Sequence, residues 1–167
     1  GLTAKRNVIL LNTYYYSPAG QAYKKPPSEL AKDLNEFITK TSTQEHWKNA
    51  RIMNRTIDGA EAALRNQYRA DYGQDLHPVT KLKKVDMIDY STNLLAQGRF
   101  FYLENPYPIG MKHADSNDIF IEEHRKFQWD EDTLDHDSPK VIEVDDHTCD
   151  QFIYFCLDNA YDLQLKV

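Results

Sequence analysis

The densest group of residues able to do chemistry lies near the C-terminus, where acidic residues flank a histidine. The run 144–150 reads Val-Asp-Asp-His-Thr-Cys-Asp. We predict that it opens a helix, in which Asp146 and Asp150 are neighbours because they are four residues apart. His147 lies with them, away from the apolar stripe. Crowded carboxylates repel unless a cation lies between them, and such oxygen ligands suit Mg²⁺ or Mn²⁺.

The same residues also fit a purely structural role. Asp145 or Asp146 can cap the helix and complement its dipole, while Asp150 faces water. Taken alone, the motif favours this structural interpretation over metal binding.

A second candidate carboxylate, Asp58, follows an expected strand over residues 51–57 and precedes Gly59 and a helix. In open α/β sheets, sites form at the carboxyl ends of strands, where such a side chain can point into a shared cleft. Asp58 fits the N-cap of an expected helix over residues 60–72 equally well. The sequence leaves both interpretations open.

Basic residues gather at Lys81, Lys83 and Lys84, just before another expected helix. A basic cluster of this kind can contact DNA phosphates. Scattered lysines more often form a solvated face, which we favour for most of them. No glycine-rich phosphate loop is present in the sequence, so we expect no ATP site.

Composition indicates an ordinary globular protein. The length of 167 residues predicts one domain over residues 1–167. No apolar run reaches membrane-span length and no signal peptide is evident, so we expect neither membrane insertion nor secretion. The net charge of −6 argues against general nucleic-acid binding, except in enzymes whose acidic clusters hold divalent cations. Cys149 and Cys156 are expected on one helix, too far apart to bridge.

Strand and helix signals alternate along the chain, which predicts an α/β fold with helices layered on a sheet. Strands are expected at residues 7–16, 51–57, 76–79, 99–103 and 141–144. Helices are expected at residues 26–38, 60–72, 84–97, 117–127 and 146–160, with Gly73 and Gly98 as stops. Residues 104–115 are expected to form a loop, and residues 129–139 an irregular acidic segment.

The order of these pieces resembles the C-terminal nuclease domain of phage large terminases. Three stretches carry the resemblance: residues 9–16 with 24–38, residues 57–64 with 83–100, and residues 122–129 with 145–150. The most specific piece is the last, where Asp146-His147 and Asp150 are similar to the family's Asp-His-x-x-Asp helix.

The resemblance implies a ribonuclease H-like mixed sheet flanked by helices, with three acidic residues that bind two divalent cations, Mg²⁺ or Mn²⁺. Asp58 matches the second acidic ligand and Asp150 the third. His147 is a candidate metal neighbour or proton shuttle, and Asp146 is expected just behind the ligands. Lys83 and Lys84 are the candidate DNA contacts.

Two departures from the family pattern affect this site. The family's first acidic ligand lies on an opening strand that would precede Gly1. The resemblance therefore implies that this first strand is missing here, and we expect it upstream in the natural protein. Asn12 also stands where a carboxylate is common.

The function implied by the resemblance is a metal-dependent endonuclease domain that cleaves concatemeric double-stranded DNA during genome packaging, in the host cytoplasm. The implied partners are an upstream ATPase domain of the same protein, a small terminase subunit and a portal protein. One alternative is another ribonuclease H-like nuclease, such as a resolvase or transposase core. The other is a noncatalytic docking module of the packaging motor, which predicts no metal binding.

Overall fold

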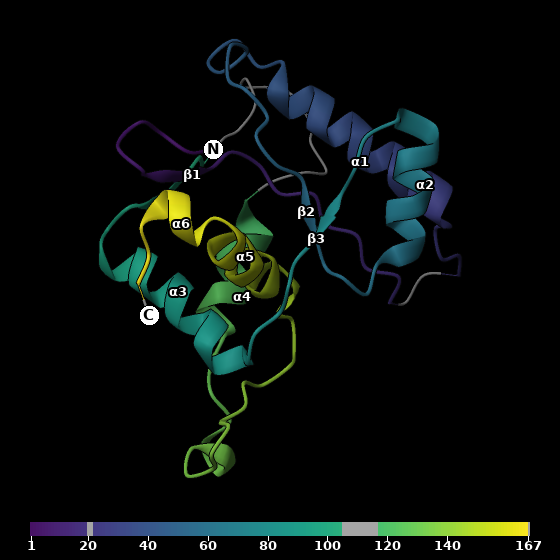
Figure 1. The fold of residues 1–167 in the computed structure, drawn as a ribbon. Coiled ribbons are helices and arrows are strands. Elements are labelled where there is room, and N and C mark those ends of the chain that lie inside the picture. Colours follow the sequence, from purple (N-terminus) through teal and green to yellow (C-terminus); the bar gives the residue numbers. More distant parts are fainter. Residues whose placement is uncertain (20–21, 105–116, 167) are drawn as a thin grey trace. The chain divides into compact units, whose positions relative to one another are not determined.

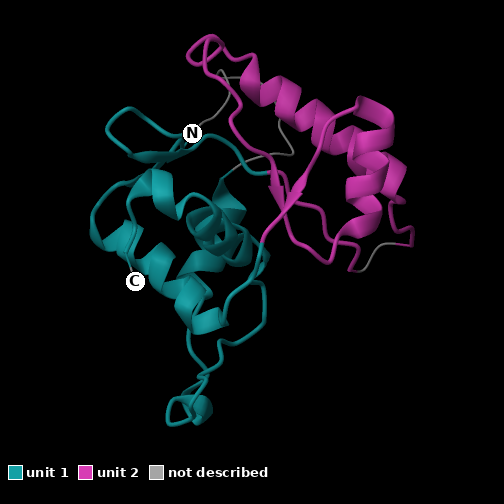
Figure 2. Cartoon of the chain, viewed as in Figure 1, with its two compact units in different colours: residues 1–13, 80–167 teal, residues 14–79 magenta. Residues whose placement is uncertain are grey.

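The computed structural model describes residues 1–19, 22–104 and 117–166. They group into two compact units, one formed by residues 1–13 with 80–167 and the other by residues 14–79 (Figure 2). The single domain expected over residues 1–167 stays a prediction.

The described part of unit 1 combines a short parallel strand pair with helices. Strand β1 (Val8–Leu10) pairs with β4 (Phe100–Tyr102), so that Val8 lies opposite Phe100. The helices are α3 (Lys84–Ala96), α4 (Asp118–Lys126), α5 (His147–Asp158) and α6 (Ala160–Leu163). Helix α5 packs against both α3 and α4, as Figure 1 shows.

The core of unit 1 forms where the apolar stripe of α5 meets α3, α4 and the strand pair. Leu94 and Cys156 are fully buried, and Phe152 is 6% exposed. The Phe152 ring lies 4.8 Å from that of Phe100 and 5.7 Å from that of Phe120, measured between centroids. Cys149 and Cys156 are both buried and free, which confirms the prediction for the two cysteines.

Unit 2 contains a helix pair and a second parallel strand pair. The elements are α1 (Pro27–Ser42), β2 (Thr56–Ile57), α2 (Ala62–Tyr72) and β3 (His77–Pro78). Tyr68 of α2 and Ala31 of α1 are fully buried where the two helices pack together. Gly73 ends α2 with a φ of 64°, the left-handed conformation for which glycine is the usual residue, so its predicted role as a helix stop is confirmed.

The expected helices all form, whereas the expected strands are shorter or absent. The strand expected over residues 51–57 is only β2, and residues 141–144 form no strand, so that prediction was wrong. Val141 instead makes an isolated antiparallel bridge to Trp129. The segment between these two residues contains the 3₁₀ turn Glu131–Thr133. The described strands form two parallel pairs rather than one mixed sheet. The expected loop over residues 104–115 lies almost wholly outside the described residues.

The α/β class is nevertheless confirmed, since parallel strand pairs alternate with helices along the chain. Among the described helices, none combines the length and apolar character needed to cross a membrane.

His124 gives unit 1 a pH dependence that can be measured. Its ring stacks on Phe120 at 3.9 Å and meets Phe152 edge-on at 5.5 Å, and this burial lowers its pKa below the ordinary 6.5. A lowered pKa means that the folded state favours the neutral ring, so this stabilisation is present above pH 6.5 and is lost as the pH falls. We expect an NMR titration of His124 to give a midpoint below 6.5, and the parent to lose more unfolding free energy than His124→Gln between pH 7 and about 5. Equal losses would contradict this assignment.

Candidate functional site

The N-terminal turns of α3 and α5 bring charged residues together in unit 1. Asp146 is at the N-cap position of α5, and Asp150 lies one turn further on. Lys84, the first residue of α3, forms an ion pair with Oδ1 of Asp150, and the two side chains are 27% and 29% exposed. The hydroxyl of Tyr154 lies 3.5 Å from the other Asp150 oxygen. The structural interpretation in which Asp150 simply faces water is therefore wrong.

The pKa of Asp146 is affected by the second acidic residue of this cluster, Asp150, which lies one turn further along α5. Burial, followed by the negative charge of Asp150, raises the pKa of Asp146 above its ordinary value, while Lys84 acts in the opposite direction. The sequence predicts repulsion between such carboxylates unless a cation is near, and within unit 1 the ammonium group of Lys84 supplies positive charge at Asp150. Lys81 lies beside the same cluster, with its Nζ 4.9 Å from the centroid of the Tyr154 ring.

A buried carboxylate from α4 holds the start of α5. Glu123 is 1% exposed, and its Oε2 accepts hydrogen bonds of 2.6 Å from both the backbone N–H and the hydroxyl of Thr148. Asp146 makes no side-chain capping hydrogen bond. The expected capping role of Asp145 or Asp146 is thus carried out by Glu123, because a carboxylate suits the free N–H groups at a helix start.

Glu123 was missed as a candidate from the sequence. The only available signal was its position three residues after Phe120, which puts an acidic side chain on the apolar face of α4. Its Oε1 is buried and has no hydrogen-bond partner among the described residues.

Asp58 lies in unit 2, at the end of β2. Its Oδ1 accepts a 3.0 Å hydrogen bond from the N–H of Ala60, which closes a tight turn ahead of α2. Because α2 begins at Ala62, its N-cap is Glu61 and not Asp58. The N-cap interpretation of Asp58 is therefore wrong, and its half-buried side chain stands at a strand end as the site hypothesis requires.

Two further candidates are exposed at helix starts. His147 is the first residue of α5, and Lys83 is the N-cap residue of α3. Lys84 differs from Lys83 because its ammonium contacts Asp150. The catalytic role of His147 and the DNA-binding roles of Lys83 and Lys84 stay predictions.

The donor chemistry at the start of α5 fits a hard divalent cation, since Asp146 and Asp150 supply carboxylate oxygens on adjacent turns. Lys84 demonstrates that positive charge is stable there. Within the described residues, no group of three or more His, Cys, Asp or Glu side chains is placed to hold a metal.

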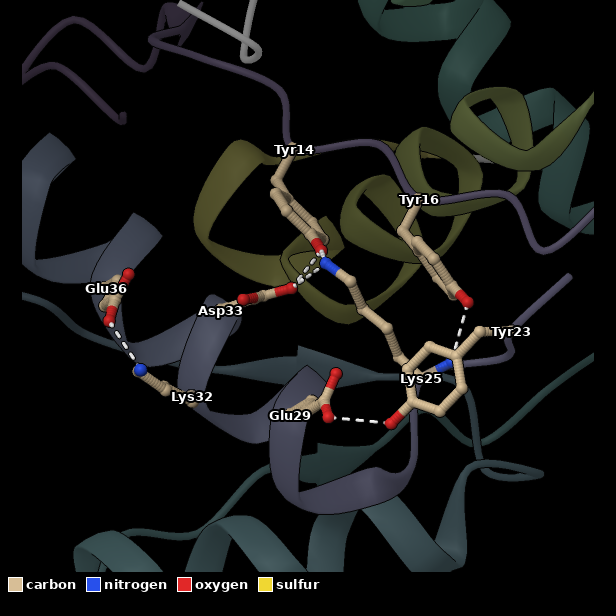
Figure 3. A network of polar contacts seen from close by, with 8 residues as sticks. All are labelled: Tyr14, Tyr16, Tyr23, Lys25, Glu29, Lys32, Asp33 and Glu36. Atoms are coloured by element: carbon tan, nitrogen blue, oxygen red, sulfur yellow. Dashed lines mark hydrogen bonds and ion pairs between the residues drawn. The ribbon is translucent and has the colours of Figure 1, made fainter. Parts of the chain in front are cut away.

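Another polar network lies in unit 2, around Asp33 of α1 (Figure 3). Asp33 accepts hydrogen bonds from the Tyr14 hydroxyl at 2.6 Å and from the Lys25 ammonium at 2.5 Å. Burial, followed by Asp33, raises the pKa of Tyr14 to about 12. Lys25 also lies 5.1 Å from the centroid of the Tyr16 ring. This network ties Tyr14 and the segment at Lys25 to α1, so Lys25 has a structural role within unit 2.

Comparison with known proteins decides the family. The model of a family described as a terminase RNase H-like domain matches residues 1–158. This chain belongs to that family. The matched range includes Asp146, His147 and Asp150 at the start of α5, the residues by which the sequence resembles the family's Asp-His-x-x-Asp helix.

Solved terminase structures share the fold. The large terminase of a thermophilic bacteriophage superposes with a TM-score of 0.63 at 19% identity, over 86% of this chain and 31% of that one. The complex of the same phage's terminase with ADP gives the same TM-score and coverage at 20% identity. The chain thus spans about a third of the length of these terminases. No curated protein matches it.

Proposed function

We propose that this chain is the metal-dependent endonuclease domain of a viral large terminase, which cleaves concatemeric double-stranded DNA during genome packaging. The observation that supports this most directly is the position of Asp150. It lies on the first turns of α5, is half-buried, pairs with the ammonium group of Lys84 and belongs to the run that resembles the family's Asp-His-x-x-Asp helix.

The proposed roles follow from residue chemistry and position. Asp150 and Asp58 are the carboxylate ligands, Asp146 stands behind Asp150, and His147 binds metal or moves a proton. Two divalent cations, Mg²⁺ or Mn²⁺, would supply charge stabilisation for the attacking and leaving oxygens of the phosphodiester when bound. Lys83, exposed at the N-cap of α3, is the proposed phosphate contact, with Lys84 next to it.

The proposed substrate is double-stranded DNA, bound through its backbone. The proposed partners are an upstream ATPase domain of the same protein, a small terminase subunit and a portal protein, and the proposed setting is the host cytoplasm during phage assembly. Family membership supports terminase partners in general.

The first test is a calorimetric titration of the chain with Mn²⁺. We expect binding that Asp150→Ala and Asp58→Ala each weaken by more than about tenfold, since changes merely behind metal ligands already cost 10–100-fold. Asp162→Ala and Asp71→Ala are matched controls, because each removes an exposed carboxylate from the same unit as one of the candidates. Both controls should leave the affinity unchanged.

Two results separate the nuclease from the docking module. No Mn²⁺ binding by the parent chain would favour the noncatalytic module, which predicts none. Binding that is insensitive to both Asp58→Ala and Asp150→Ala would remove these two residues from the metal site. Binding that depends on both should be accompanied by Mn²⁺-dependent cleavage of plasmid DNA once the upstream acidic strand is present. A requirement for branched DNA in that assay would favour the resolvase alternative instead.

A further inference from the structure

The ion pair between Lys84 and Asp150 affects how a divalent cation can bind at the proposed site, because both cations need the same carboxylate. We infer that Lys84 is a built-in counter-cation, which holds Asp150 until a divalent cation displaces its ammonium group. This inference rests on the proposed function, because it requires that Asp150 be a metal ligand.

The geometry of unit 1 brings this lysine to the carboxylate from a distant part of the chain. Lys84 and Asp150 are 66 residues apart and meet because the starts of α3 and α5 pack together. Both side chains are largely shielded, at 27% and 29% exposure, so their attraction is screened less than that of a pair on the open surface. Asp146 lies one turn away and adds negative charge at the same place. The ammonium group of Lys84 therefore binds Asp150 where a second carboxylate, that of Asp146, lies one turn away.

Lys84 also has other acceptors to move to when displaced. It lines a hollow of about 460 Å³ together with the segment 139–143 and Asp130. The acidic residues Asp130 and Glu143 both line this hollow, beside Lys140, and Oδ1 of Asp130 also accepts a 3.2 Å hydrogen bond from the N–H of Asp132. A flexible four-carbon stem lets lysine move between such acceptors. Release from Asp150 therefore need not leave the charge of Lys84 without a counter-ion.

The effect of Lys84 on the affinity of Asp150 for a divalent cation can be estimated, because both cations compete for the same carboxylate. An opposite charge within a few ångströms lowers the pKa of a carboxyl group by about 1–3 units, which is roughly a 10- to 1,000-fold loss of affinity for the proton. The same electrostatics apply to any other cation that binds the same oxygens. Removing Lys84 should consequently strengthen the binding of a divalent cation, which is the opposite of what a lysine that merely stabilises the fold would do.

The test is a set of Mn²⁺ titrations at one pH on the parent chain and five variants, with circular dichroism to verify folding. Two of the variants are Asp150→Ala and its combination with Lys84→Met. Lys84→Met keeps the stem and removes the charge, and it should bind Mn²⁺ at least about tenfold more tightly than the parent. Lys84→Arg keeps the charge and should resemble the parent. Lys5→Met removes an exposed lysine from the same unit and controls for net charge.

The possible outcomes distinguish this inference from the proposed function. Binding that requires Asp150 but is equal or weaker in Lys84→Met would overturn the inference alone. A gain in Lys84→Met that disappears when Asp150→Ala is added would establish it. An equal gain in Mn²⁺ affinity in Lys5→Met would show that the change in net charge, and not the position of Lys84, is responsible, and would overturn the inference. No Mn²⁺ binding by the parent or by Lys84→Met would overturn both proposals.

Discussion

Phe152→Ala is expected to lower the free energy of unfolding by about 3–5 kcal/mol, the usual cost of emptying a buried aromatic site. Phe152 is 6% exposed on α5, and its ring contacts those of Phe100 on β4 and Phe120 on α4. One side chain therefore joins three elements of unit 1. Urea unfolding followed by circular dichroism measures the loss.

Phe101→Ala is the matched control for this change. Phe101 neighbours Phe100 on β4 but is 49% exposed, so its truncation removes little buried area and should cost no more than about 1 kcal/mol. Comparable losses for the two variants would show that the core of unit 1 is not built around the α5 stripe.

Glu123→Ala is the second change with a large expected effect, about 3 kcal/mol of unfolding free energy. The substitution leaves the N–H and the hydroxyl of Thr148 buried without their acceptor, and burying unpaired polar groups is costly. Glu123→Gln retains one acceptor oxygen and should cost less. Chemical denaturation of both variants, with the neighbouring substitution Glu122→Ala as control, measures the difference.

A double-mutant cycle decides whether this cost belongs to the Glu123–Thr148 contact. Thr148→Val should destabilise the parent but cost much less in the Glu123→Ala background, with a coupling of about 0.5–3 kcal/mol. Strictly additive costs would contradict the contact. The result bears on the site as well, because the turn that Glu123 holds also carries Asp150.

Local features of the chain were predictable because they depend on residues close in sequence. The apolar spacing of α5, the Pro27 start of α1 and the glycine stop of α2 each correspond to an observed boundary. The candidate residues Asp58 and Asp150 were likewise found from short motifs. Strand lengths were predicted poorly, because a segment such as residues 51–57 forms a strand only where another segment lies beside it to pair with.

What the sequence determined by itself is the α/β class, the helices, the reduced core cysteines and the motif order that marks a terminase RNase H-like domain. The tertiary structure alone decided which charges meet. Lys84 pairs with Asp150 across 66 residues, and Glu123 caps α5 from 25 residues away. No periodicity or spacing in the sequence predicts either contact. Both contacts arise because helices that are far apart in the sequence pack against each other in the fold.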